Sequence, residues 1–318
     1  MGSFSTASVS LSHTIGSAAI SLRASGFVAL PRVRECVRFP VRRLAFYSGR
    51  MSVRQRKRRW GRRSGDGPAR GGAFDRLSCR WRSGRPVVTG AITATCVAVW
   101  IVEMVLCRGG FRAAFDVFVV NGAFTPLLFH VKPWTALTMM FLHAPNLWHL
   151  LFNMVALWLV GPVVERMVGH WQYLCLYLVC GLGGDLGLMA WASLPVASGE
   201  VVSAYGASGA IMGLFGALLV MYKRSGVQIR SLVILVVILL AEPLLYDDIA
   251  WQVHVGGLAV GLLMAVLLAG HVPGLARLTW RKRTVLVDAV VAVAIVVALV
   301  ALGWRLALPV LATPGVSA

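Results

Sequence analysis

Residues 203–222 read SAYGASGAIMGLFGALLVMY, a stretch without a single charged side chain. A helix needs about 20 predominantly apolar residues to cross the ~30 Å hydrocarbon core of a bilayer. Six further stretches are comparably long and apolar, and the seven predicted spans are 86–106, 149–168, 171–193, 203–222, 230–246, 251–270 and 284–308. The sequence therefore predicts an all-α polytopic membrane protein.

The overall composition agrees with this prediction and excludes a soluble enzyme. Of the 318 residues, 58% are hydrophobic and 14% are charged, against roughly 45–50% and about 25% in ordinary soluble domains. A soluble globule of this composition would have too little polar surface to cover itself. The six cysteines show no paired spacing, so neither a disulfide framework nor a zinc site is expected from them.

Most of the net charge of +19 lies in an arm at the amino terminus. Residues 1–85 contain 19 of the 31 Lys and Arg residues and three acids, whereas residues 86–318 are nearly neutral. Because the charge is not spread over a folded domain, no nucleic-acid partner is expected. The run RQRKRRWGRR at 54–63 cannot fold by itself, so the arm is expected to be disordered, cytoplasmic and in contact with anionic lipid. Two alternatives stay open: a targeting peptide, or a true start at Met51.

The connections between the spans fit one orientation in the membrane. Basic loops remain on the cytoplasmic side. The loops after the fourth and sixth spans are basic, whereas the charged residues of the loop after the fifth span are all acidic. The amino terminus is therefore expected inside and the carboxyl terminus outside. The outer segment 107–148 is long and rich in aromatic residues. We expect it to form short helices in the membrane interface, anchored by Trp134 and Trp148.

Four polar residues lie near the starts of even-numbered spans. Ser208 belongs to the fourth span, His254 to the sixth, and His149 and Asn153 to the second. All even-numbered spans run from outside to inside, so the four residues are expected at similar depth in the outer third of the membrane. Polar groups placed there are costly and are therefore functional candidates.

The fourth and sixth spans also carry small residues that favour close packing. The packing candidates are Gly206, Gly209, Gly213, Gly257 and Gly261, and they include two GxxxG motifs. Glycines at this spacing let two membrane helices approach backbone to backbone. Such contact between the two spans would bring the hydroxyl of the fourth span within reach of the imidazole of the sixth.

A serine beside a histidine is a chemically competent pair. The histidine can remove the hydroxyl proton while the oxygen attacks a carbonyl carbon. His149 and Asn153 are four residues apart and share one helix face, so with the backbone N–H of Ser208 they could stabilise the oxyanion. No acid is evidently placed to orient His254, because Asp247 and Asp248 are expected to face water. The sequence predicts a dyad.

A metal site is the competing interpretation of these histidines. His143, His149 and His254 could in principle bind zinc as three histidines. The sequence contains no HExxH motif, and no carboxylate lies near His149. We therefore expect no metal, and we expect His143 to be a hydrogen-bonding residue at the end of the outer segment.

Three motifs together resemble the rhomboid family of intramembrane serine proteases. They are FLHAPNLWHLLFNMVALWLVGPVVERMVG at 141–169, GASGAIMGLFG at 206–216 and HVGGLAVG at 254–261. The resemblance covers roughly residues 86–270 and implies six core helices and cleavage of transmembrane-anchored proteins near the outer membrane face. It assigns Ser208 as nucleophile, His254 as general base, and His149 and Asn153 as oxyanion donors. It implies no cofactor, and it makes the seventh span a carboxyl-terminal addition to a six-helix core.

The expected organisation is a basic arm at 1–85, a catalytic core at 86–270, and a cytoplasmic loop with the seventh span at 271–318. The alternative function is that of a non-proteolytic rhomboid-like protein that binds membrane clients. Inactive relatives usually lack the serine or the histidine, and this chain has both. The expected location is the cell membrane, with an organelle inner membrane as the alternative because of the arm.

Overall fold

The computed structural model describes residue 81 and residues 84–195, 202–242, 250–269 and 272–311. Most of the predicted basic arm, and Asp247 and Asp248, lie outside the described residues. The helices are α3 (Val87–Arg108), α4 (Arg112–Gly122), η1 (Pro126–Leu128), α5 (Thr135–Thr138), η2 (Met139–Phe141), α6 (Leu147–Val168), α7 (His170–Ala192), α8 (Ser208–Arg224), α9 (Arg230–Ala241), α10 (Trp251–Leu268), α11 (Pro273–Ala276) and α12 (Trp280–Leu311). Within this part of the chain, the β-structure is limited to an isolated bridge between Phe124 and Ala204. The protein is an all-helical polytopic membrane protein, as the sequence predicts.

In the described part of the chain, five helices are long and apolar enough to cross a bilayer: α3, α6, α7, α10 and α12. The other two predicted spans correspond to shorter helices, because α8 has 17 residues and α9 has 12. The fourth span was expected to begin at 203, but α8 begins at Ser208. The reason is local: Ala204 pairs with Phe124, and Gly206 has a φ of +137°, which a helix cannot contain.

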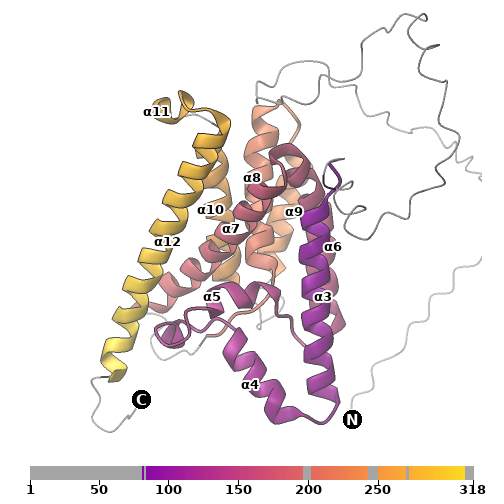
Figure 1. The fold of residues 1–318 in the computed structure, drawn as a ribbon, viewed down its shortest axis with the longest axis vertical. Helices are drawn as coiled ribbons and strands as arrows, with labels where there is room; N and C mark the ends of the chain where they lie inside the picture. The colour runs from indigo at the N-terminus through magenta and orange to yellow at the C-terminus, as the bar shows by residue number, and fades with distance from the viewer. Residues whose placement is uncertain (1–80, 82–83, 196–201, 243–249, 270–271, 312–318) are drawn as a thin grey trace, which may run out of the picture. The chain divides into compact units, whose positions relative to one another are not determined.

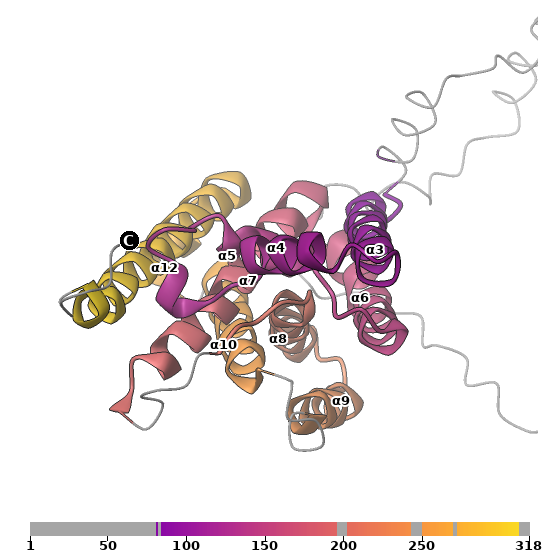
Figure 2. The same ribbon diagram turned by 90° about the horizontal axis from the view of Figure 1, so that it is seen from below.

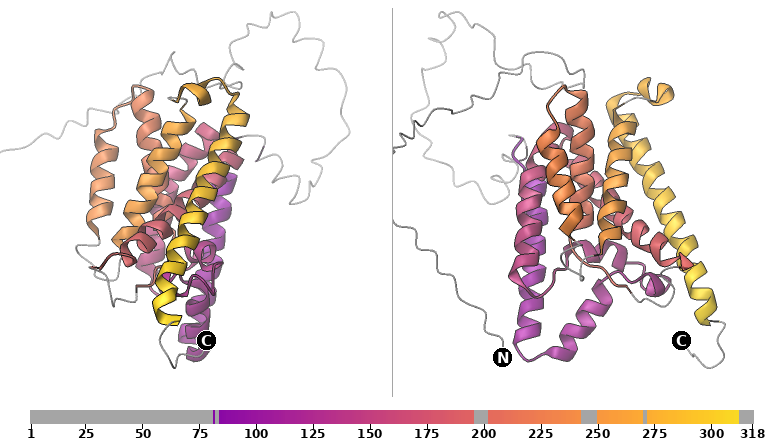
Figure 3. Two further views of the ribbon diagram at one scale, coloured as in Figure 1. Left: turned by 90° about the vertical axis from the view of Figure 1, so that its left-hand side faces the viewer. Right: turned by 180° about the vertical axis from the view of Figure 1, so that it is seen from behind.

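Helices α7, α8 and α10 form the centre of the bundle (Figures 1 and 2). Helices α3 and α6 pack together along one edge, and α12 packs on α7 at the opposite edge, as the views in Figure 3 also show. A hydrogen bond joins α12 to α7: Gln172 Nε2 of α7 donates to Asp288 Oδ1 of α12 at 2.9 Å. The segment that contains α4, η1, α5 and η2 crosses one end of the bundle (Figure 2). In this segment, the ring centroid of His130 lies 6.1 Å from that of Trp304 in α12.

Glycines let the central helices touch through their backbones. A Cβ added to Gly257 of α10 would overlap the carbonyl oxygen of Gly209 in α8. One turn further along, a Cβ on Gly261 would overlap the carbonyl oxygen of Gly213. The order of these contacts shows that α8 and α10 run parallel. Helix α7 approaches the other side of α10 in the same manner, since a Cβ on Gly187 would lie 3.0 Å from Gly256 Cα.

A buried carboxylate fixes the edge formed by α3 and α6. Glu165 accepts hydrogen bonds from the backbone N–H groups of Val88 and Thr89, both at 2.9 Å, and from the Thr89 hydroxyl at 2.6 Å. The first N–H groups of a helix have no partner within the helix, and their partial positive charge favours an anion. Glu165 of α6 thus caps the first turn of α3 across 77 residues of sequence.

The predicted interface segment consists of short helices that contact the bundle. Gly206 N donates to Met139 O at 2.9 Å, which joins the segment to the residues before α8. Tyr177 of α7 donates its hydroxyl to Met140 O at 3.4 Å. A Cβ on Gly181 would overlap the Met140 side chain. This segment is therefore held against α7 and against the start of α8.

The substitution Gly257→Ala tests the backbone contact between α8 and α10. The added methyl group must push the helices apart, and we expect the free energy of unfolding to fall by roughly 1–3 kcal/mol. The measurement is the thermal unfolding midpoint of the purified protein in detergent. The matched control is Gly274→Ala, since a Cβ at Gly274 meets no atom within 4 Å. Equal midpoints for the two variants would show that the contact does not stabilise the fold.

Candidate functional site

The four predicted polar residues lie at the beginnings of three helices. Ser208 is the first residue of α8, His254 is the fourth residue of α10, and His149 is the third residue of α6, with Asn153 one turn later. Helix α6 begins here because the Asn146 side chain accepts the N–H of His149 at 2.8 Å, which is an ordinary N-cap. Three helix starts thus present the candidates at one end of the bundle.

The residues next to the serine and the histidine are in contact. Gly209 directly follows Ser208, and a Cβ there would lie 2.6 Å from Cγ1 of Val253, the residue before His254. The turn of Ser208 therefore packs on the turn of His254. Among the described residues, no hydrogen bond joins Ser208 Oγ to the His254 ring. His254 is only 4% exposed, and its Nδ1 atom has no hydrogen-bond partner.

His149 faces the serine across Gly206. A Cβ on Gly206 would lie 3.1 Å from His149 Nε2 and 3.8 Å from Ser208 Oγ. The missing side chain therefore leaves open the space between these two polar atoms. The same glycine has a φ of +137°, which side chains other than hydrogen rarely allow.

The hydrogen bonds of His149 fix which ring nitrogen carries the proton. The backbone N–H of Ala144 donates to His149 Nδ1 at 2.9 Å, so Nδ1 is the acceptor in the neutral ring. The proton then resides on Nε2, the atom beside Gly206 and Ser208. Asn153 donates one amide N–H to His149 O at 2.9 Å, which leaves the second N–H for another acceptor.

Two residues of α3 hold the turn that contacts His149. Glu103 accepts the N–H of His143 at 3.1 Å, and Trp100 Nε1 donates to Ala144 O at 3.2 Å. The sequence alone assigns Glu103 no role. A carboxylate within a predicted span is nonetheless a signal of a specific partner, and the partner is the turn that precedes α6. Helix α3 thereby acts on the His149 ring through one backbone amide.

His143 and Tyr205 complete the surroundings of His149. The ring centroids of His143 and His149 lie 5.3 Å apart, and Tyr205 approaches His149 edge-on at 6.3 Å. Burial, followed by the neighbouring His149, lowers the pKa of His143 to about 4, so the ring is neutral at neutral pH. In the described part of the chain, His143, His149 and His254 do not form a cluster that could hold a metal ion. Tyr205 had no sequence signal beyond its position before Gly206.

Comparison with known proteins places this site within a familiar domain. Residues 130–271 match the protein-family model described as the Rhomboid domain. The chain is 35% identical over 140 residues to Rhomboid protease GluP of Bacillus subtilis, covering 42% of this chain and 26% of that protein. It is 33% identical over 139 residues to Putative rhomboid protease YdcA of the same organism, covering 42% of this chain and 66% of that protein.

Similarity extends to a plant protein. RHOMBOID-like protein 6, mitochondrial, of Arabidopsis thaliana is 32% identical over 148 residues, covering 43% of this chain and 44% of that protein. The chain thus spans between about a quarter and two thirds of the length of these relatives, and the matched domain at 130–271 contains all four candidate residues. The matched domain includes the three helix starts and the turn that precedes α6. By these matches the chain belongs to the rhomboid family.

Proposed function

We propose that the protein is an intramembrane serine endopeptidase in which Ser208 is the nucleophile and His254 the general base. The single observation that carries the proposal is the backbone contact between Gly209 and Gly257. One glycine follows the serine directly and the other lies one turn after the histidine, so the two reactive groups are on facing turns. The named proteases among the relatives support the same activity.

The reaction follows from the groups at this site. Ser208 Oγ attacks the scissile carbonyl carbon while its proton passes to His254. The tetrahedral intermediate collapses, the C–N bond breaks, and His254 protonates the leaving amine. Water then attacks the acyl-enzyme, gives its proton to His254 and releases a carboxylate as serine regains its hydrogen. The hydrogen bond between serine and histidine is absent here and would form as substrate binds, as catalytic hydrogen bonds often do.

The oxyanion would be stabilised by three donors. His149 offers Nε2–H, because Ala144 already occupies Nδ1. Asn153 offers its remaining amide N–H, and Ser208 offers its backbone N–H. The N–H of the first helical residue has no acceptor within α8, and the start of a helix favours negative charge. These donors are held in place before the charge develops, which makes them effective.

The substrates we propose are proteins anchored by a transmembrane segment, cleaved near the outer membrane face. This face follows from the basic loops and basic arm that the sequence places inside. A transmembrane helix hides its carbonyl groups in backbone hydrogen bonds. The scissile segment must therefore unwind, so small or helix-destabilising residues near that face should be preferred.

A fluorescent fluorophosphonate tests the nucleophile directly. The detergent-solubilised full-length protein should be labelled on Ser208, and Ser208→Ala should lose both labelling and cleavage of a membrane-anchored substrate, the latter by roughly 10⁴-fold or more. Ser225→Ala is the matched control, because its hydroxyl bonds Met221 O at the opposite end of α8. Cleavage by a folded Ser208→Ala protein would refute the mechanism. A wild-type protein that binds substrate without being labelled would favour the client-binding alternative.

Substitutions at Glu103 test the support of His149 by α3. Glu103→Gln keeps an oxygen that can accept the His143 N–H, whereas Glu103→Leu removes it. We expect the leucine variant to lower kcat by roughly tenfold to a hundredfold with little change in KM, since an oxyanion donor acts mainly in the transition state. The glutamine variant should retain most of the activity. Equal losses in both variants, or a loss confined to KM, would contradict this positioning role.

A further inference from the structure

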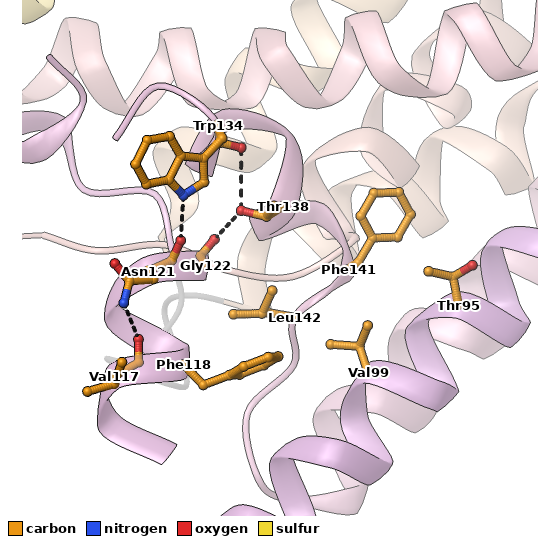
Figure 4. A pocket seen from close by; sticks show the side chains of 10 residues that line it. All are labelled: Thr95, Val99, Val117, Phe118, Asn121, Gly122, Trp134, Thr138, Phe141 and Leu142. Carbon is orange, nitrogen blue, oxygen red and sulfur yellow. Dashed lines mark hydrogen bonds between the residues drawn. The ribbon is translucent and has the colours of Figure 1, made fainter. Parts of the chain in front are cut away.

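A cavity of about 530 Å³ lies between α3, α4 and the segment 134–142, away from Ser208. Its volume falls within the roughly 300–1,000 Å³ of small-molecule sites. Figure 4 shows its walls: Val99 comes from α3, Phe118 from α4, and Leu142 from the end of the crossing segment. None of these residues belongs to the catalytic proposal above.

The polar side chains around this cavity each donate a hydrogen bond to a backbone carbonyl. Asn121 donates its amide to Val117 O at 2.8 Å, and Trp134 donates its indole N–H to Asn121 O at 3.0 Å (Figure 4). Thr138 bonds Gly122 O at 2.8 Å, and Thr95 bonds Ala91 O at 3.0 Å. All four bonds are made to backbone carbonyls. The cavity therefore presents mainly hydrocarbon to its contents, and this lining suits an apolar ligand better than a polar ligand or an unwound peptide backbone.

The position of the cavity in the fold indicates which kind of molecule occupies it. Thr95 and Val99 lie in the middle of α3, a helix long and apolar enough to span a bilayer. Thr95 is exposed, and Val117 on the opposite wall is 61% exposed. The opening thus faces the lipid-exposed side of the helix rather than the packed core. From the apolar lining and this opening we infer that the cavity binds one acyl chain of a membrane phospholipid, inserted between α3 and α4.

An acyl chain in this position would pack against the segment that holds residues of the candidate active site in place. Leu142 lines the cavity and directly precedes His143, whose N–H is held by Glu103. Met139, next to the cavity-lining Thr138, accepts the N–H of Gly206. The segment from Thr138 to His143 would thus contact the acyl chain on one side, and on its other side it holds Gly206 and the backbone of His143 in place. This consequence rests on the proposed protease function, whereas the binding itself does not.

A photoreactive lipid tests the binding. The full-length protein is reconstituted with phosphatidylcholine carrying a diazirine in the middle of one chain, extracted into detergent, irradiated and mapped by peptide mass spectrometry. Label should persist on the peptides containing Val99 and Val117 after extraction. Detergent should remove the lipid from Val293 and Val297 of α12 before irradiation, so the peptides containing these residues, which are 61% and 62% exposed, should carry no label. Loss of label from both regions together would overturn the inference.

Two filling variants provide the specificity test. Val99→Trp and Val117→Trp fill the cavity from opposite walls, and each should lower labelling roughly tenfold, which corresponds to losing the burial of about two methylene groups. Ile101→Trp is the control, because Ile101 is 50% exposed on α3 and does not line the cavity. Undiminished labelling in both filling variants would overturn the inference, as would displacement of the lipid by an added transmembrane substrate. Ser208→Ala should bind lipid normally, so failure of the protease proposal remains distinguishable.

Discussion

The backbones of α8 and α10 touch at two glycine pairs, Gly209 with Gly257 and Gly213 with Gly261. Lipid tails offer no hydrophobic driving force for bringing membrane helices together, so the association depends on close packing and on the backbone approach that small residues allow. A Cβ on Gly257 or Gly261 would overlap the carbonyl oxygen of the facing glycine, so side chains there would force the helices apart. The distance between the serine turn and the histidine turn is therefore set by the absence of four side chains.

This constraint is local in sequence, which is why much of the fold could be predicted. Apolar runs predicted the spanning helices, and the spacing of glycines indicated which two would meet. The polar candidates followed, because His149, Ser208 and His254 interrupt apolar segments. The start of α8 was not predicted correctly. Hydropathy does not register that Ala204 pairs with Phe124, nor that Gly206 adopts a φ that ends any helix.

The supporting contacts could not be predicted, because they join residues far apart in the chain. Glu165 reaches Val88 across 77 residues, and Glu103 reaches His143 across 40. Sequence showed only that each carboxylate stands in an apolar helix, where an unpaired charge would be costly. The partner in both cases is a backbone amide, which carries no signature in the sequence. Side-chain motifs thus indicated the candidate reactive groups, while contacts to backbone amides, which join distant parts of the chain, determine how the helices and the turn before α6 are held.

The polar side chains around the cavity and those at the candidate active site differ in how many of them lack a hydrogen-bond partner. Around the cavity between α3 and α4, every lining polar side chain bonds a backbone carbonyl. At the candidate active site, His143 Nε2, Asn153 Oδ1 and His254 Nδ1 are buried without partners in the described structure. Each such group costs about 1–3 kcal/mol unless water or a ligand satisfies it. A hydrolase needs water at its serine and must keep lipid out of that space. The proposed protease site thus contains buried polar groups that water and a peptide could satisfy, whereas the lining of the neighbouring cavity suits the proposed acyl chain.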